Sequence, residues 1–312
     1  MRFAFTDDQL ALRDAVRDFL EKECPPSVVR DAWTNDSGRS GLWAKLGALG
    51  VLGVLAPERV GGLGGDFLDL VLLLEETGRA ALPEPVVEHA AVALPALEDP
   101  GRAAVGEVTV SVGLPGSKLV SYADSADVVL LDDEAFAPDA LALERCDSVD
   151  GSRRLFMVGW GPFAMKGEWF ERGALGTAAQ LLGLGQHLLD VTVEYAQQRH
   201  QFGAPIGSFQ AVKHKLADLR LALEFARPVV HRAAYSVAHA DGDRSVHVSM
   251  AKAYASDAAL LAARHALQVH GAIGYSYEHD LHLWMKRAWT LAASWGDAAW
   301  HRARVGRAIL SS

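Results

Sequence analysis

Cysteine is scarce in this chain of 312 residues, which holds only Cys24 and Cys146. Neither a Cys-x-x-Cys pair nor a Cys/His spacing typical of zinc sites is present. We therefore expect no disulfide framework and no structural metal, and we interpret both thiols as buried or inert.

Long hydrophobic runs are also missing, since no stretch of eighteen consecutive apolar residues occurs. The start of the chain, MRFAFTDDQL, lacks the basic-then-apolar layout of a secretory signal. The sequence therefore predicts a cytoplasmic protein that does not enter a membrane.

Positive charge is in the minority, because 30 Lys and Arg stand against 39 Asp and Glu and give a net charge of −9. No basic stripe interleaved with aromatic residues is present, so a nucleic-acid partner is not expected. An anionic ligand would have to be held by individual arginines rather than by the field of the whole protein.

The first third of the chain carries helix signals. Thr6 and Gln9 fit a capping box, which predicts a helix over residues 7–23. Apolar spacing predicts a short helix over 42–49 and another over 67–79. The glycine-rich stretch 61–65 lacks the strand and the Lys-Ser/Thr of a phosphate loop, so we interpret it as a helix connection.

Between residues 106 and 160 the periodicity changes to that of short strands. Val108, Val110 and Val112 alternate with polar residues, and compact apolar runs follow at 127–131 and 155–158. Pro, Gly and Asp separate these runs, which predicts a small antiparallel β lobe.

From residue 171 onward, helical periodicity returns and persists. Long amphipathic helices are predicted from 171, from 212 and over 244–270, with one or two more within 280–310. The predicted fold class is α+β, mainly α. It comprises an N-terminal helical domain (1–104), a small β domain (105–166) and a C-terminal four-helix bundle (167–312).

The most informative segment is 195–218, which reads YAQQRHQFGAPIGSFQAVKHKLAD. Gly203 and Pro205 break the arriving helix, and Ser208 is placed to cap the next one. Arg199 is then displayed at a helix end beside a turn, where its planar guanidinium suits a diphosphate. For this residue alone, the alternative is a surface ion pair.

Three groups of motifs occur in one order along the chain. They are residues 46–50, 55–62 and 74–79 near the start, the Arg199-x-x-Phe202-Gly203 turn, and QVHGAIGY at 268–275 followed by Glu278. Together they resemble the acyl-CoA dehydrogenases over nearly the whole chain.

In that family FAD lies across the interface of two subunits. The resemblance implies that Arg199 binds the diphosphate and that Phe202 packs on the cofactor. It also implies further cofactor-binding residues, on the adenine side of the neighbour's FAD or in the same turn: Phe209, Gln210, Gln268, His270 and Gly271.

The same resemblance calls for a carboxylate that takes the α-proton of the substrate while hydride leaves for the flavin. In most members this base is a glutamate in the last quarter of the chain, and Trp295 stands at that position. An indole can neither accept the proton nor leave room for a thioester beside the flavin. Some members carry the base at the start of the first bundle helix, where the count gives Gly173, with Glu171 nearby as an alternative base.

The β region also departs from the family. The Thr-Glu-Pro-x-x-Gly-Ser-Asp segment that contacts flavin and substrate has no counterpart between residues 92 and 116. The resemblance therefore implies a truncated β domain.

The missing base and the missing β segment both belong to the same half of an active site. The resemblance therefore implies the smaller, non-catalytic subunit of a heteromeric (α2β2) acyl-CoA dehydrogenase, similar to actinobacterial steroid-CoA dehydrogenases. Such a subunit would share FAD with a larger acyl-CoA dehydrogenase subunit, which would hold most of the acyl-CoA substrate. Electron-transfer flavoprotein would accept the electrons. Two alternatives stay open: a homomeric acyl-CoA dehydrogenase that uses Glu171 as base, and a flavin-free scaffold protein on this fold.

Overall fold

The computed structural model describes residues 4–35, 40–132, 134–164 and 167–310. Its first third is helical, as predicted. The Thr6 and Gln9 side chains each accept a hydrogen bond from the other residue's backbone N–H, at 2.9 and 3.2 Å. The helices are α1 (Asp7–Glu23), α2 (Pro26–Thr34), α3 (Trp43–Ala48) and α4 (Phe67–Arg79), so the predicted ranges 7–23 and 67–79 are confirmed.

A buried stretch of unusual helix follows α4. It consists of the π-helix η2 (Val87–Ala93), the 3₁₀ turn η3 (Leu94–Ala96) and the short helix α5 (Gly101–Ala104). His89 in η2 is fully buried, accepts a hydrogen bond from the backbone N–H of Val110 at 3.0 Å and donates to the carbonyl of Ala103 at 3.1 Å. Burial lowers its pKa to about 4, so the neutral imidazole ties η2 to the first strand.

The β region contains two small sheets. One has the order β1 (Val110–Val112), β3 (Val128–Leu131), β4 (Glu134–Phe136), and the other β2 (Leu119–Ser121), β6 (Leu155–Val158), β5 (Leu143–Cys146). The antiparallel prediction is wrong at one place, because β1 and β3 pair in parallel. The chain leaves the first sheet to form β2 in the second and returns in the original direction, so no hairpin joins β1 to β3.

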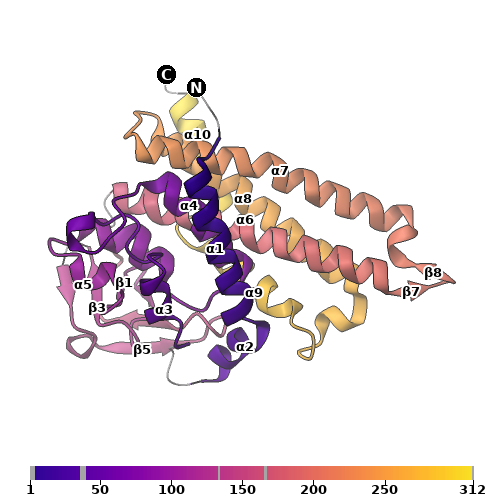
Figure 1. The fold of residues 1–312 in the computed structure, drawn as a ribbon, viewed down its shortest axis with the longest axis horizontal. Helices are drawn as coiled ribbons and strands as arrows, with labels where there is room; N and C mark the ends of the chain where they lie inside the picture. Colours follow the sequence, from indigo (N-terminus) through magenta and orange to yellow (C-terminus); the bar gives the residue numbers. More distant parts are fainter. Residues whose placement is uncertain (1–3, 36–39, 133, 165–166, 311–312) are drawn as a thin grey trace.

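The C-terminal half forms the helical bundle, and the predicted fold class is confirmed. Its long helices α6 (Gly167–Gln198), α7 (Gln210–Ala238) and α8 (Arg244–His270) lie side by side (Figure 1). Two shorter helices complete the region, α9 (Leu281–Ala293) and α10 (Ala298–Leu310).

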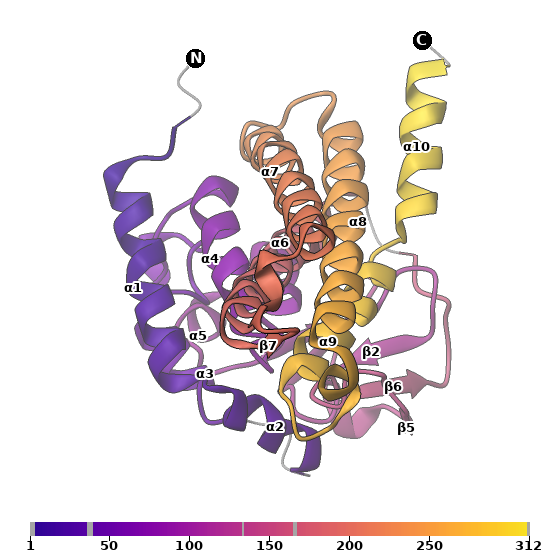
Figure 2. The same cartoon turned by 90° about the vertical axis from the view of Figure 1, so that its right-hand side faces the viewer.

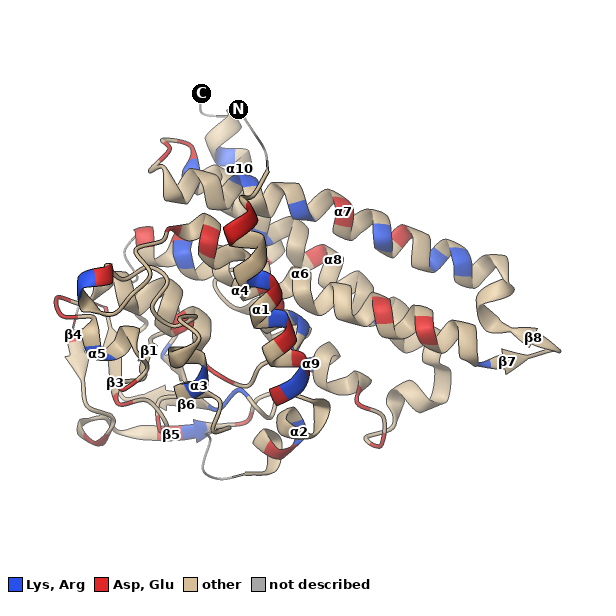
Figure 3. Ribbon diagram, viewed as in Figure 1, with Lys and Arg blue, Asp and Glu red and all other residues tan. Residues whose placement is uncertain are grey.

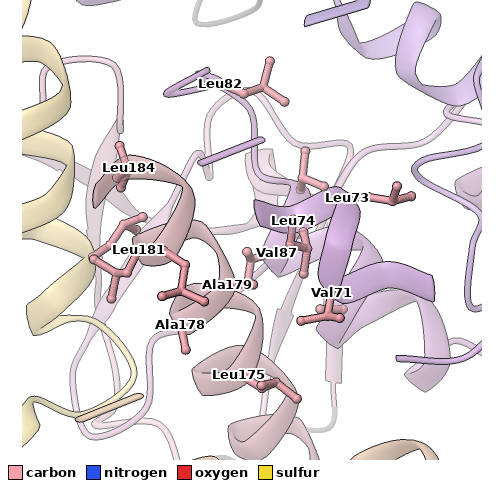
Figure 4. Close-up of a cluster of buried hydrophobic side chains, with 14 of the residues drawn as sticks. Val71, Leu73, Leu74, Leu82, Val87, Leu175, Ala178, Ala179, Leu181 and Leu184 are labelled. Atoms are coloured by element: carbon pink, nitrogen blue, oxygen red, sulfur yellow. The ribbon is translucent and has the colours of Figure 1, made fainter. Parts of the chain in front are cut away.

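The N-terminal helices and the bundle share one core, centred on α4 and α6. Leu74 of α4 and Val87 of η2 pack on α6 beside Gly176, in the cluster of buried side chains that also includes Leu175 (Figure 4). The two backbones touch at two glycines: a Cβ on Gly183 would lie 1.8 Å from the carbonyl oxygen of Glu75, and one on Gly78 would lie 2.1 Å from that of Gln180. Any side chain at either position would push the helices apart, so these glycines set how α6 is held.

Candidate functional site

The bundle ends in a tight hairpin between α6 and α7. Strand β7 (His200–Gln201) pairs antiparallel with β8 (Ala204–Pro205). The two turn residues, Phe202 and Gly203, have φ of +52° and +81°, which is the type I′ geometry that fits a two-residue hairpin. The predicted break of the helix is confirmed, but Ser208 does not cap α7: its hydroxyl donates to the carbonyl of Pro205 instead, at 2.7 Å.

Arg199 lies at the base of this hairpin with an exposed side chain. Its backbone is fixed, because its N–H donates to the carbonyl of Tyr195 and its carbonyl accepts from the N–H of Ile206, both at 2.8 Å. Within the part of the chain that the structure describes, no partner holds its guanidinium. Residues 200–212 carry no Lys, Arg, Asp or Glu, and Figure 3 shows the hairpin uncoloured beyond its base. Arg199 therefore has a fixed backbone and a guanidinium whose donors remain free for a phosphate.

Phe202 is held in a position that gains little from contacts within its own chain. Its side chain is 95% exposed, and its left-handed backbone conformation is unfavourable for a bulky residue. Phe209 lies nearby, 38% exposed and edge-on to it with ring centroids 6.2 Å apart, and Gln210 begins α7 with an exposed side chain. Exposed aromatic groups held on a strained turn suit a contact with something outside the chain.

The turn that ends α8 lies at the same end of the bundle, which Figure 2 views head-on. Gln268 and Gly271 are exposed there, whereas the His270 side chain is only 4% exposed. The structure thus brings the predicted surface residues of both turns to one end and places the His270 imidazole behind that surface. The exposed donors of Arg199 and Gln268 and the open backbone at Gly271 are groups of the kind that suit a dinucleotide.

Gly271 leaves the backbone of this turn open to a ligand. Its φ and ψ of +64° and −137° are accessible to glycine alone, and a Cβ there would meet nothing within 4 Å.

Changing Gly271 to Ala is expected to cost about 1–3 kcal/mol of backbone strain and to move the turn. The melting temperature of the lone chain would decrease, as would the flavin content of the heteromeric complex that the family resemblance implies. Gly242→Ala is the control, since a Cβ there also meets nothing within 4 Å and no left-handed φ is involved. Equal flavin content in the two variants would contradict a cofactor contact at Gly271.

The second candidate region surrounds Trp295, at the opposite end of α6 from the hairpin. Its indole is 3% exposed and lies directly on Gly173, where an added Cβ would be 2.3 Å from the ring atoms Cε3 and Cζ3. Trp295 and Gly296 both have left-handed φ, at +58° and +84°. The two positions that the family resemblance offered for a base therefore face each other here, and the indole fills the space between them.

Lys252 holds this loop in place, although nothing in the sequence singled it out beyond a lone lysine in an alanine-rich helix. It is fully buried on α8, and its ammonium group donates to the carbonyls of Ala292 and Gly296 at 3.0 Å and to the hydroxyl of Ser256 at 3.2 Å. Burial lowers its pKa to about 7, and the Asp297 carboxylate opposes that fall. Two of these hydrogen bonds hold the backbone on either side of Trp295, at Ala292 and Gly296, and so keep the indole against Gly173.

Buried charges join the three parts of the chain beside the loop. Arg153, for which the sequence indicated no role, donates to the hydroxyl of Ser294 at 2.6 Å and forms an ion pair with Glu88 at 3.4 Å. Arg287 pairs with Asp150 close by. Each cation has a carboxylate partner, so the network joins η2, the β region and α9 without an uncompensated buried charge.

Glu171 is placed as a structural ion-pair partner. It is 5% exposed, and its carboxylate contacts Arg244 of α8 at 2.9 Å and Arg304 of α10 at 3.3 Å. A carboxylate held by two guanidinium groups would lose both ion pairs on taking a proton. The geometry therefore disfavours Glu171 as a general base.

Replacing Glu171 with Gln is expected to lower the free energy of unfolding by about 1–3 kcal/mol, because Arg304 loses its counter-charge and Arg244 keeps only that of Glu168. Both arginines remain partly solvated, which limits the cost. Dehydrogenation by the heteromeric complex that the family resemblance implies should be unchanged once the complex has assembled. A fall in turnover of a hundredfold or more, at normal stability, would instead identify Glu171 as the base.

Other site chemistry is limited in the described ranges. Within them, no group of three or more His, Cys, Asp or Glu side chains is arranged to hold a metal ion. Cys24 is buried and its pKa is raised to about 12 by burial, and neither cysteine forms a disulfide. No helix among these residues is long and apolar enough to cross a membrane.

Comparison with known proteins agrees with this architecture. The N-terminal domain model of acyl-CoA dehydrogenases matches residues 6–105, and the C-terminal domain model matches residues 159–310. Acyl-CoA dehydrogenase IpdE2 of Mycolicibacterium smegmatis is 33% identical over 295 residues, covering 91% of this chain and 93% of that protein. The chain therefore belongs to the acyl-CoA dehydrogenase family, whose members generally use FAD.

Solved structures of two complexes share the fold over nearly the full length. A chain of the ChsE4–ChsE5 complex from Mycobacterium tuberculosis superposes with a TM-score of 0.89 at 25% identity, covering 100% of both chains. A variant of the Tcur3481–Tcur3483 steroid ACAD gives a TM-score of 0.83 at 22% identity, covering 98% of each chain.

Proposed function

We propose that this chain is the smaller, non-catalytic subunit of a heteromeric, FAD-dependent acyl-CoA dehydrogenase and completes the FAD site of a larger subunit. One contrast supports the proposal: the outward surface around Arg199 is open and unpaired, whereas the indole of Trp295 fills the space beside Gly173. A chain whose surface around Arg199 is open, but whose own space beside Gly173 is filled, is suited to complete the cofactor site of a partner.

Each surface residue has a chemical role in this proposal. The free guanidinium of Arg199 donates to the diphosphate, and Phe202 covers the cofactor from outside. The exposed amides of Gln210 and Gln268 offer both donors and acceptors to the adenosine end, and Gly271 lets the backbone approach it. FAD, when bound, supplies the hydride acceptor.

The α-proton of the acyl-CoA must then be taken by a carboxylate of the larger subunit. Trp295 has no basic atom, and Glu171 is engaged by Arg244 and Arg304. The proposed reaction is α,β-dehydrogenation of an acyl-CoA thioester held mainly by the partner, with electron-transfer flavoprotein as acceptor.

A steroid-derived acyl group is the substrate class that the comparisons favour. One of the similar complexes is described as a steroid ACAD, and another is a complex of two named components. An α2β2 assembly follows if two such pairs associate. The acyl group itself would be defined by the pocket of the larger subunit.

Co-expression with a full-length homologue encoded beside this chain tests the proposal. We expect one FAD per heterodimer by absorbance and protein assay, and no bound flavin in this chain purified alone. Full FAD occupancy of the lone chain, with reduction of a dye by acyl-CoA, would overturn the proposal in favour of a homomeric enzyme.

A further inference from the structure

The proposed FAD surface is made by two turns that are far apart in sequence. Arg199 follows α6 and Gly271 ends α8, so their separation depends on what joins these two helix ends. The side chains of Tyr195 and His270 lie between them. Their rings stack with centroids 4.2 Å apart and planes 20° from parallel, and the Tyr195 hydroxyl donates to the His270 carbonyl at 3.5 Å.

His270 is held in one orientation for this contact. Its Nδ1 lies 2.9 Å from the carbonyl oxygen of Ala266, which can only accept, so Nδ1 carries the proton. The ring of His279 meets it edge-on at 5.0 Å. Burial lowers the pKa of His270, which favours the neutral ring that stacks on Tyr195.

Tyr195 contacts both turns at once. Its ring meets His270, the residue before Gly271, while its carbonyl accepts the backbone N–H of Arg199 at 2.8 Å. A hollow of about 380 Å³ lies beside the stack and is lined in part by Tyr195, Gln198 and His270. The stack therefore joins the ends of α6 and α8 at the edge of a space that is otherwise open.

We infer that Tyr195 and His270 are positioning residues that set the spacing between Arg199 and Gly271 to match the diphosphate and the adenosine of one FAD. This inference rests on the proposed function. The two rings would affect FAD affinity by holding the two turns in place. Neither ring would touch the reacting atoms.

The test assembles variants of this chain with the larger subunit, removes the flavin, and compares the FAD affinities of the resulting apo-complexes by flavin fluorescence. Tyr195→Leu removes the stack, and we expect FAD to bind about three- to tenfold more weakly, the range given by aromatic pair energies. His270→Leu should have a similar effect, and the double variant should be little worse than either single one, since both remove the same contact. Tyr195→Phe keeps the ring and should retain near-normal affinity.

The chain offers a matched control in the Tyr235–His239 pair near the other end of α7. Its rings are stacked at 4.0 Å and 17°, away from the proposed FAD surface. Tyr235→Leu should lower the melting temperature of the lone chain as Tyr195→Leu does, yet leave FAD affinity unchanged. A Tyr195→Leu affinity within twofold of the parent, or an equal loss in Tyr235→Leu, would overturn the positioning role.

Arg199→Ala separates this inference from the function on which it rests. If Arg199→Ala weakens FAD binding and Tyr195→Leu does not, only the positioning role is wrong. If neither variant changes FAD affinity, the composite site and the positioning role are both wrong. Should Tyr195→Leu prevent assembly, His270→Leu decides by the same criteria.

Discussion

Replacing Arg199 with Ala is expected to weaken FAD binding to the heteromeric complex by about ten- to hundredfold. Charge-assisted hydrogen bonds to a diphosphate contribute about 1.5–3 kcal/mol, and every 1.4 kcal/mol corresponds to a tenfold change in affinity. The loss would appear as colourless complex after gel filtration and as a higher Kd in titrations with FAD. The lone chain should keep its melting temperature, because the guanidinium has no partner among the described residues.

Two comparisons sharpen this result. Arg199→Lys keeps the charge without the planar fork, so we expect an intermediate affinity. Arg59→Ala removes an exposed arginine from the 3₁₀ turn Glu58–Val60, outside the bundle, and should leave FAD binding unchanged. If the Arg199→Ala complex kept its full flavin content, the composite site would be refuted and the flavin-free scaffold would become the better explanation.

Gly173→Ala is the change expected to disturb the fold most at the closed site. The added methyl carbon would lie 2.3 Å from two atoms of the Trp295 indole, and the loop that carries the indole is held by Lys252. Overpacking of this kind costs about 1–3 kcal/mol, and more where the neighbour is fixed. The melting temperature should decrease by several degrees, at roughly 2–4 °C per kcal/mol of lost stability.

The control for this prediction is another helical glycine. A Cβ on Gly306 of α10 would meet nothing within 4 Å, so Gly306→Ala should be neutral or stabilising, by about 0.5–1 kcal/mol.

The cause can be isolated with a second substitution. In a Trp295→Ala background the steric penalty of Gly173→Ala should vanish, since the atoms it meets are gone. If Gly173→Ala cost the same in both backgrounds, the indole would not be what closes this space.

Local interactions explain why much of the fold was predictable. The capping box of Thr6 and Gln9 and the apolar spacing of α4 operate over a few residues, so the ranges of α1 and α4 could be predicted directly. The break of the helix after α6 follows from Gly203 and Pro205 for the same reason, whereas the pairing of β7 with β8 was not predicted. The parallel pairing of β1 with β3 was missed, because it depends on where the chain passes between them.

The candidate site divides in the same way. The order of the motifs predicted the family and the residues around Arg199, and the exposed turn needs only local chemistry to present that side chain. The direction of the His270 ring was not predictable, since it depends on Tyr195, 75 positions earlier in the chain. The ion pairs of Glu171 likewise depend on how α8 and α10 cross α6.

By itself, then, the sequence determined the family, the mainly helical fold and the absence of a basic group at residue 295. Only the tertiary structure decided that Trp295 rests on Gly173, that Lys252 holds it there, and that two distant turns meet through Tyr195 and His270. The physical reason is that helix periodicity specifies which face of a helix is buried. The backbone contacts at Gly78 and Gly183 then determine which distant residues that face meets.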